Sequence, residues 1–278
     1  MVKLTIDLIG NKAQFAGMHF SHLMHNIPRP FSADHGHEAR HFFAADGEEI
    51  QDFVAAVAGS SPYLKGLIEK EHQWLRGAFA QPDAALKVEF SNLKATAGSD
   101  LMSALRRAKR RVALWTALCD LAGVWALEEV TEALSKFADL ACQISLNHAL
   151  KVQLQRGKIP MRKPETDPAG LGMFVLAMGK LGANELNYSS DIDLICFFDE
   201  SYFASVDVFE ARAGFIRATK NMVALLNDIT AEGYVFRTDL RLRPDPSVRL
   251  TLQLKLCHES VTMQLKLNEG LPLRKHAN

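Results

Sequence analysis

Carboxylates alternate with apolar side chains at the start of residues 191–198, and this pattern limits the possible folds more than any other feature of the sequence. Asp191 and Asp193 are separated by one aliphatic residue, and the rest of the segment is apolar. Residues two apart lie on the same face of a strand, so the carboxylates would share one face while the aliphatic side chains enter a core. The apolar run 173–178 predicts a second strand.

A third strand is predicted over residues 234–242, and its polar side chains also alternate. Asp239, Arg241 and Arg243 would share one face of it. One carboxylate beside two guanidinium groups suits a phosphate bound next to a metal ion, because arginine binds phosphate oxygens in pairs. A pair of surface aspartates and a ladder of cross-strand ion pairs are the structural alternatives.

The acidic residues of these strands predict a metal site. Neighbouring carboxylates repel one another unless a cation lies between them, and oxygen ligands of this kind suit Mg²⁺. Asp191, Asp193 and Asp239 are therefore the predicted metal ligands and catalytic residues. Two Mg²⁺ ions about 4 Å apart would support phosphoryl or nucleotidyl transfer.

A turn bounded by glycines, residues 179–182, follows the first predicted strand. Gly179 and Gly182 allow backbone N–H groups to approach an anion, and Lys180 adds a positive charge. The spacing fits neither a P-loop nor a dinucleotide-binding GxGxxG motif. Together with the acidic strands, the turn predicts a binding site for nucleotide phosphates.

The fold class predicted is α+β, with an N-terminal helical region before a mixed sheet flanked by helices. Apolar residues at helical spacing predict helices within residues 47–59, after Ser61, after Ser99 or Asp100, over 131–149 and over 207–231, the last ending at Gly233. The predicted parts are an irregular segment 1–46, a helical region 47–160, a catalytic core 161–248 and an atypical tail 249–278.

A run of basic residues over 106–111 lies within the third of these predicted helices. It is interpreted as a largely outward-facing, solvated helix face, with a docking surface for an acidic partner as the alternative.

Charge, cysteines and hydropathy exclude several classes of protein. The 32 basic and 32 acidic residues balance, which gives no footprint for nucleic acid or an anionic membrane. The four cysteines form no CxxC pair, so buried thiols are expected rather than a disulfide framework or zinc site. Histidines scattered through the first 41 residues lack the partners of a metal site. The absence of a long apolar run favours a cytoplasmic protein.

The segments 179–195 and 239–244 resemble the signature of the bifunctional glutamine synthetase adenylyltransferase/adenylyl-removing enzymes. The resemblance extends over about residues 45–248 and implies a nucleotidyltransferase fold like that of DNA polymerase β. The form Glu-Leu-Asn-x-Ser-Ser-Asp-Ile-Asp is similar to that of the adenylyl-removing domain. That domain uses inorganic phosphate to remove AMP from a tyrosine of glutamine synthetase, which releases ADP.

The resemblance also implies residue roles and partners. Asp191 and Asp193 would bind Mg²⁺ with Asp239 as the third carboxylate, and the glycine turn and Ser190 would line the phosphates of ATP or ADP. Glutamine synthetase and a PII-type nitrogen-signalling protein are the implied partners.

The sequence departs from the family after residue 248, where an aromatic pair and a Trp-Glu-Arg helix are expected but missing. We interpret residues 249–278 as a frameshifted reading and the chain as truncated. An inactive fragment that only binds its partners, and a different metal-dependent nucleotidyltransferase, remain the alternative functions.

Overall fold

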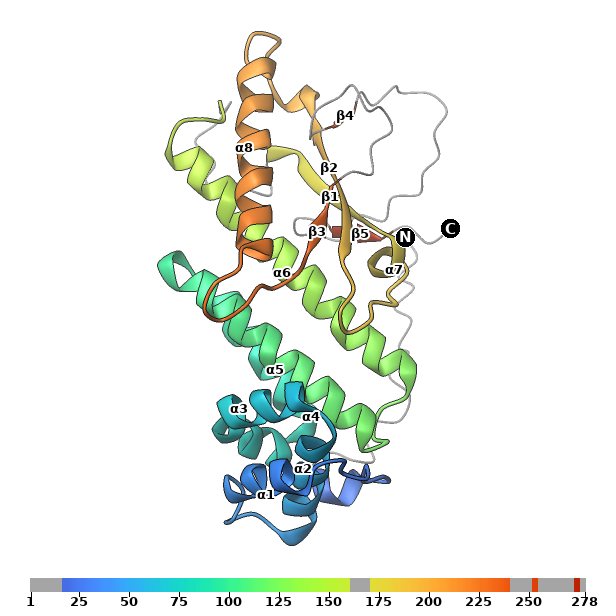
Figure 1. Ribbon diagram of the computed structural model, residues 1–278. Coiled ribbons are helices and arrows are strands. Elements are labelled where there is room, and N and C mark those ends of the chain that lie inside the picture. The colour runs from blue at the N-terminus through green and yellow to red at the C-terminus, as the bar shows by residue number, and fades with distance from the viewer. Residues whose placement is uncertain (1–16, 161–170, 241–251, 255–272, 276–278) are drawn as a thin grey trace. The chain divides into compact units, whose positions relative to one another are not determined.

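The computed structural model describes residues 17–160, 171–240, 252–254 and 273–275 (Figure 1). The chain divides into two compact units, and the division passes through helix α5 (Leu101–Leu121) after Ala113. The first, here called the helical unit, consists of Met1–Ser91 and Leu114–Ala126; the sheet unit consists of Asn92–Ala113 and Leu127–Asn278. The fold is α+β, as predicted, whereas the predicted domain boundaries stay predictions.

The helical unit is built from short helices around an aromatic core. Its elements are η2 (Phe20–Leu23), α1 (Ala33–His41), α2 (Glu48–Ser60), α3 (Pro62–Ala80), the first part of α4 (Pro82–Ala95) and the last part of α5. Helix α3 begins as predicted, because the Ser61 side chain accepts a hydrogen bond from the Leu64 N–H and Pro62 occupies the first turn.

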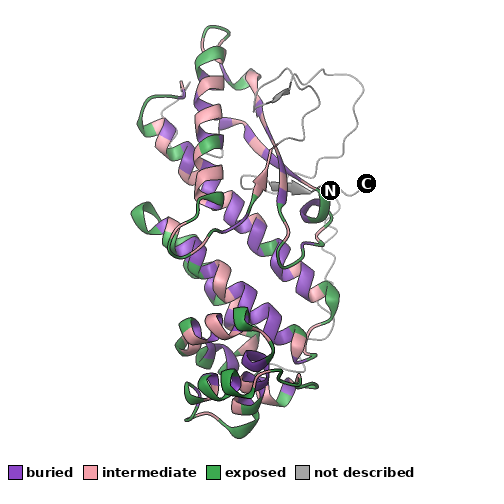
Figure 2. Ribbon diagram, in the orientation of Figure 1, coloured by how far each residue is buried: buried purple, intermediate pink, exposed green. Residues whose placement is uncertain are grey.

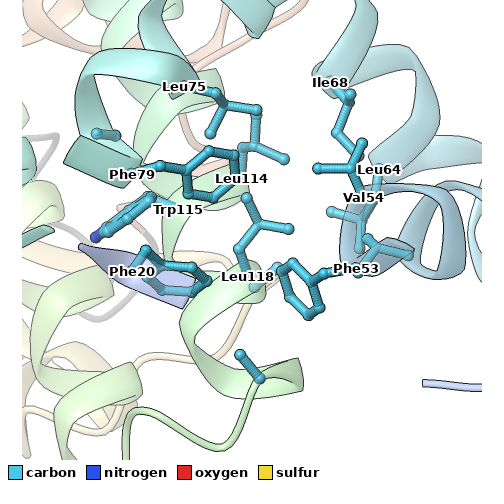
Figure 3. Packing of buried hydrophobic residues seen from close by; sticks show 14 of the residues in the cluster. Phe20, Phe53, Val54, Leu64, Ile68, Leu75, Phe79, Leu114, Trp115 and Leu118 are labelled. Atoms are coloured by element: carbon cyan, nitrogen blue, oxygen red, sulfur yellow. The ribbon is translucent and has the colours of Figure 1, made fainter. Parts of the chain in front are cut away.

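Phe20 lies among the aromatic rings of this core (Figure 3). Its ring centroid lies 5.1 Å from that of Trp115 and 5.3 Å from that of Phe79, and all three side chains are buried. Leu114 and Leu118 of helix α5 belong to the same cluster. Apolar residues from separate helices therefore bury one another and hold this unit together.

Helix α1 lies in the segment that was predicted to be irregular, so that prediction is wrong for residues 33–41. Ser32 caps the helix by accepting a hydrogen bond from the His35 N–H. Only Gly36 and Ala39 of the helix are buried. Such a narrow buried face of small residues gives little hydrophobic periodicity, which explains why the pattern was missed.

The sheet unit combines long helices with a mixed sheet, as the sequence predicted. Its elements are η3 (Gly98–Asp100), the first part of α5, α6 (Leu127–Gln155), β1 (Met173–Met178), α7 (Gly179–Gly182), β2 (Ile192–Asp199), η5 (Glu200–Tyr202), α8 (Val208–Asn227), β3 (Thr238–Asp239), β4 (Leu252–Leu254) and β5 (Leu273–Lys275). The strand order is β3-β2-β1-β5, and β4 also pairs with β2. Strands β1 and β2 are antiparallel, while the other pairings are parallel.

The two faces of strand β2 have different surroundings. Ile192, Leu194, Cys196 and Phe198 are buried, whereas the residues between them are only half-buried. The ring of Phe198 lies 5.0 Å from that of Phe215 on helix α8, so the helices cover this face. Figure 2 shows the buried residues running along helix α6, which packs against α8. Asp193 lies on the opposite, less buried face.

Two predicted boundaries near residue 230 are wrong. Helix α8 ends at Asn227 rather than residue 231, and Gly233 lies in the loop beyond it. The third strand begins at Thr238 rather than residue 234. Residues 235 and 236 donate their N–H groups to the Leu226 carbonyl at the end of helix α8, so these groups are not available to a sheet.

The basic run in helix α5 also differs from its prediction. Arg106 was expected to face largely outward, but its side chain is buried, while Arg107 is exposed. The guanidinium donates to carbonyl oxygens of the segment after helix α8, which satisfies its polar groups without solvent.

Among the described residues, no helix has the length and apolar character needed to cross a membrane. Residues 161–170, at the start of the predicted catalytic core, lie outside the described residues.

Candidate active site

Asp193 and Asp239 lie side by side on adjacent strands. Asp193 is on β2, Asp239 is on β3, and the register of this parallel pair places the two residues directly opposite one another. Paired strands lie about 4.8 Å apart and paired residues point to the same face, so both half-buried carboxylates lie on one face of the sheet. The structure therefore brings together two of the three predicted metal ligands.

Gly179 places the backbone of the glycine turn next to this pair. Its φ angle is +56°, and a Cβ atom at this position would lie only 2.8 Å from Oδ2 of Asp193. A side chain here would therefore be strained by the backbone conformation and would also meet the carboxylate. The predicted turn is a single helical turn, α7, closed by a hydrogen bond from the Ala183 N–H to the Gly179 carbonyl at 3.0 Å.

The other residues of the turn differ in exposure. Lys180 is exposed, while Gly182 is buried beneath the turn. The Glu185 N–H donates to the Lys180 carbonyl at 2.8 Å, which fixes the backbone just beyond the turn. Lys180 is thus accessible to an anion from solvent.

Asp191 lies one residue before strand β2 and is exposed. Its Oδ1 accepts a hydrogen bond from Nε of Arg237, and Nη2 of the same arginine donates to the Ser189 carbonyl at 3.2 Å. Arg237 was missed in the sequence, although it stands two residues before Asp239 and extends the same alternation of polar side chains. The Asp191–Arg237 pair links the two acidic segments.

The loop before strand β2 is fixed to helix α6 by a buried hydrogen bond. The Leu186 N–H donates to Oγ of Ser135 at 3.1 Å, and both residues are fully buried. Ser190, a predicted phosphate ligand, is half-buried near the end of this loop and donates its N–H to the Asn187 carbonyl at 3.3 Å. Helix α6 thus fixes the path of the chain toward Asp191.

Arg241 and Arg243, the predicted phosphate clamp, lie outside the described residues. Within the described part of the chain, no three side chains of histidine, cysteine, aspartate or glutamate gather closely enough to hold a metal ion. The paired carboxylates of Asp193 and Asp239 still provide oxygen donors of the kind that Mg²⁺ prefers, and the carboxylate of Asp193 lies directly against the Gly179 backbone.

The cysteines described in the structure are buried and free, as expected. Burial raises the pKa of the Cys196 thiol to about 12, and it also raises the pKa of Cys142. Both thiols stay protonated near neutral pH, so they are poor nucleophiles and poor metal ligands.

A family model and individual curated proteins both match this chain, and the two comparisons agree with each other. The model of the family described as glutamate-ammonia ligase adenylyltransferase matches residues 50–252. The proteins to which the chain is similar include three that are each named bifunctional glutamine synthetase adenylyltransferase/adenylyl-removing enzyme. It is 42% identical over 203 residues to the one from Bradyrhizobium sp. (strain BTAi1 / ATCC BAA-1182), with 71% of this chain and 21% of the relative covered.

The relative from Bradyrhizobium diazoefficiens is 43% identical over 203 residues, with 71% of this chain and 20% of the relative covered. The relative from Agrobacterium fabrum is 37% identical over 207 residues, with 71% of this chain and 21% of the relative covered. The chain spans about a fifth of the length of the curated relatives that it matches.

Proposed function

Because the chain belongs to the glutamate-ammonia ligase adenylyltransferase family, we propose that its sheet unit carries an adenylyl-transfer site that acts on glutamine synthetase. The register of Asp193 and Asp239 beside Gly179 is the observation that carries this proposal. Paired carboxylates supply the oxygen ligands that a metal ion bound to nucleotide phosphates requires.

The proposed direction is removal of AMP rather than its addition. Inorganic phosphate attacks the phosphorus of the adenylylated tyrosine, the bond from phosphorus to the tyrosine oxygen breaks, and the tyrosine oxygen takes up a proton. The products are ADP and the free tyrosine. The Glu-Leu-Asn-x-Ser-Ser-Asp-Ile-Asp form of residues 185–193 supports this direction through its resemblance to the adenylyl-removing domain.

Asp193 and Asp239 are the proposed Mg²⁺ ligands, with Asp191 as the third carboxylate. Bound Mg²⁺ would neutralise charge on the phosphate groups and so reduce the repulsion between two anionic reactants. Arg237 holds the carboxylate of Asp191 near strand β2. Gly179 has no side chain, which allows the carboxylate of Asp193 to lie against the glycine turn.

The remaining proposed roles concern the phosphate groups. Lys180 supplies a mobile positive charge at the edge of the glycine turn, and the backbone and hydroxyl of Ser190 supply hydrogen-bond donors. Arg241 and Arg243 are proposed to clamp phosphate oxygens. A PII-type protein as regulator and the cytoplasm as location are proposed from the sequence alone.

The rate of ADP release from adenylylated glutamine synthetase, phosphate and Mg²⁺ tests this function. We expect Asp193→Asn to reduce the rate by about a hundredfold or more, because it removes a charged ligand of the metal. Asp199→Asn is the matched control, since it changes the same strand about 20 Å away and should leave the rate nearly unchanged. Equal rates for the wild type and Asp193→Asn would contradict the proposal. Mg²⁺-ADP binding without any release would favour a chain that binds but does not catalyse.

A further inference from the structure

The segment 228–237 of the sheet unit connects helix α8 to strand β3 (Figure 1), and basic side chains of helix α5 contact it. Arg106 makes the main contacts. Its buried guanidinium donates from Nε to the Gly233 carbonyl at 2.8 Å and from Nη2 to the Asp228 carbonyl. Nη1 donates to the Leu225 carbonyl at 3.3 Å, in the last turn of helix α8. One side chain thus fixes both the start and the middle of the segment.

Two further cations on helix α5 hold the same segment. Nζ of Lys109 lies 4.1 Å from the ring centroid of Phe236, and Nη1 of Arg110 lies 3.5 Å from Oε1 of Glu232. These residues follow Arg106 by three and four positions, so they lie on the same side of the helix. The three cations contact different parts of one connection.

The segment leads directly into the candidate site. Val235 and Phe236 donate their N–H groups to one carbonyl in the last turn of helix α8, at 2.9 and 3.0 Å. The next residue, Arg237, pairs with Asp191, and Asp239 follows two residues later. Any shift of the segment 228–237 would therefore move both Arg237 and Asp239.

Strand β3 holds Asp239 through only a short ladder. Among the described residues it consists of Thr238 and Asp239 alone, whereas strands commonly have about five or six residues. The position of Asp239 must therefore depend on the segment before it. The planar guanidinium of Arg106, with its fixed set of donors, restricts carbonyl positions more strongly than a flexible ammonium group could.

We propose that Arg106, together with Lys109, is a positioning residue that fixes Arg237 against Asp191 and Asp239 against strand β2. The inference rests on the proposed function, because the site that these residues position is the proposed adenylyl-transfer site. Neither residue is placed in contact with substrate; both act through the segment 228–237.

Hydrogen exchange of the backbone amides tests the positioning without reference to activity. We expect Arg106→Lys and Lys109→Met to speed exchange over residues 228–239 by about tenfold or more, with exchange in helix α6 unchanged. Arg107→Met, at an exposed position of the same helix, is the matched control and should change neither region. Unchanged exchange over 228–239, or a uniform increase throughout the chain, would overturn the proposal.

A double-mutant cycle on Mg²⁺-ADP affinity, measured by titration calorimetry, separates positioning from general destabilisation. We expect Arg106→Lys to weaken binding by about tenfold in the wild type and by less than about twofold in the Asp239→Asn background. Equal effects in both backgrounds would overturn the proposal. If Arg106→Lys does not fold, Lys109→Met replaces it in the cycle. If Asp239→Asn itself leaves the affinity unchanged, the proposed function fails at this residue, and the exchange experiment alone decides the positioning.

Discussion

At the scale of single residues, the candidate site depends on how closely backbone and carboxylate approach one another. Gly179 has a positive φ angle and lies directly against Asp193. Asp191 is exposed and accepts a hydrogen bond from Arg237. Close neighbours of the carboxylates therefore decide how these groups are available to a metal ion.

Replacing Gly179 by alanine should damage the site and the fold together. The left-handed backbone would cost about 1–2 kcal/mol of stability, and the new methyl group would press against Oδ2 of Asp193. We expect Mg²⁺-ADP affinity to fall by about tenfold, since the carboxylate is displaced. Gly66→Ala, in helix α3 with open space around it, should instead stabilise the protein by about 0.5–1 kcal/mol. Unchanged affinity in Gly179→Ala would show that this approach does not matter for binding.

The partly buried Lys109 gives a prediction about pH. Burial lowers the pKa of Lys109 from 10.5 to about 8. The ring of Phe236 favours the charged form by about 1–2 kcal/mol, and burial outweighs it. Between pH 8 and 10.5 the folded chain binds fewer protons at this residue than the unfolded chain, so its contribution to the unfolding free energy rises with pH.

Denaturant titrations of the wild type and Lys109→Met measure this contribution directly. We expect the wild type to gain stability relative to the variant as pH rises through this window. A difference in unfolding free energy that does not change with pH would show that the lysine pKa is not lowered.

At the scale of elements, helices of the sheet unit fix the loops that carry the site. Ser135 of helix α6 accepts the Leu186 N–H, so Ser135→Ala would leave a buried donor without its partner. We expect a loss of about 1–3 kcal/mol in stability and faster exchange of the Leu186 amide. Ser103→Ala, at an exposed position of helix α5, should cost less than about 0.5 kcal/mol. Similar losses for the two variants would argue against this role of Ser135.

Strands with strong patterns were predictable from the sequence, and segments with long-range partners were not. Strand β1 has its predicted bounds and β2 is shifted by one residue, because uniform apolar runs and strict alternation are local signals. The predicted start of the third strand and the predicted end of helix α8 were wrong. Residues 235 and 236 bond to the carbonyl of Leu226, and a partner this far along the chain leaves no local pattern in the sequence. The sequence pattern predicts that Arg106 is an exposed cation. Its burial is explained by hydrogen bonds to carbonyl oxygens of a segment more than a hundred residues away.

The same distinction applies to the candidate site. Alternation predicted the face of each strand on which Asp193 and Asp239 lie, whereas their direct pairing depends on the register of strands β2 and β3, which alternation does not give. Arg237 could have been included, because it shares that alternation. The contact of Gly179 with Asp193 could not be predicted, since it depends on the angle at which the turn leaves strand β1.

At the scale of the whole molecule, the two units can be followed separately. All three tryptophans, Trp74, Trp115 and Trp125, belong to the helical unit, so tryptophan fluorescence reports on its unfolding. Phe20→Ala would remove the ring that packs on Trp115 and should destabilise this unit by about 3–5 kcal/mol. Phe31→Ala, at an almost fully exposed position, should change stability by less than about 0.5 kcal/mol. If Phe20→Ala and the wild type had the same denaturation midpoint by tryptophan fluorescence, this result would contradict the packing described for Phe20.

We propose that Asp193 and Asp239 form one site that transfers the adenylyl group of glutamine synthetase to phosphate. The most direct test incubates the chain with adenylylated glutamine synthetase, Mg²⁺ and radiolabelled phosphate, and follows the label. We expect the wild type to transfer label into ADP and Asp239→Asn not to do so. Label that stays in phosphate with a folded chain, or that enters ADP equally well with Asp239→Asn, would contradict it.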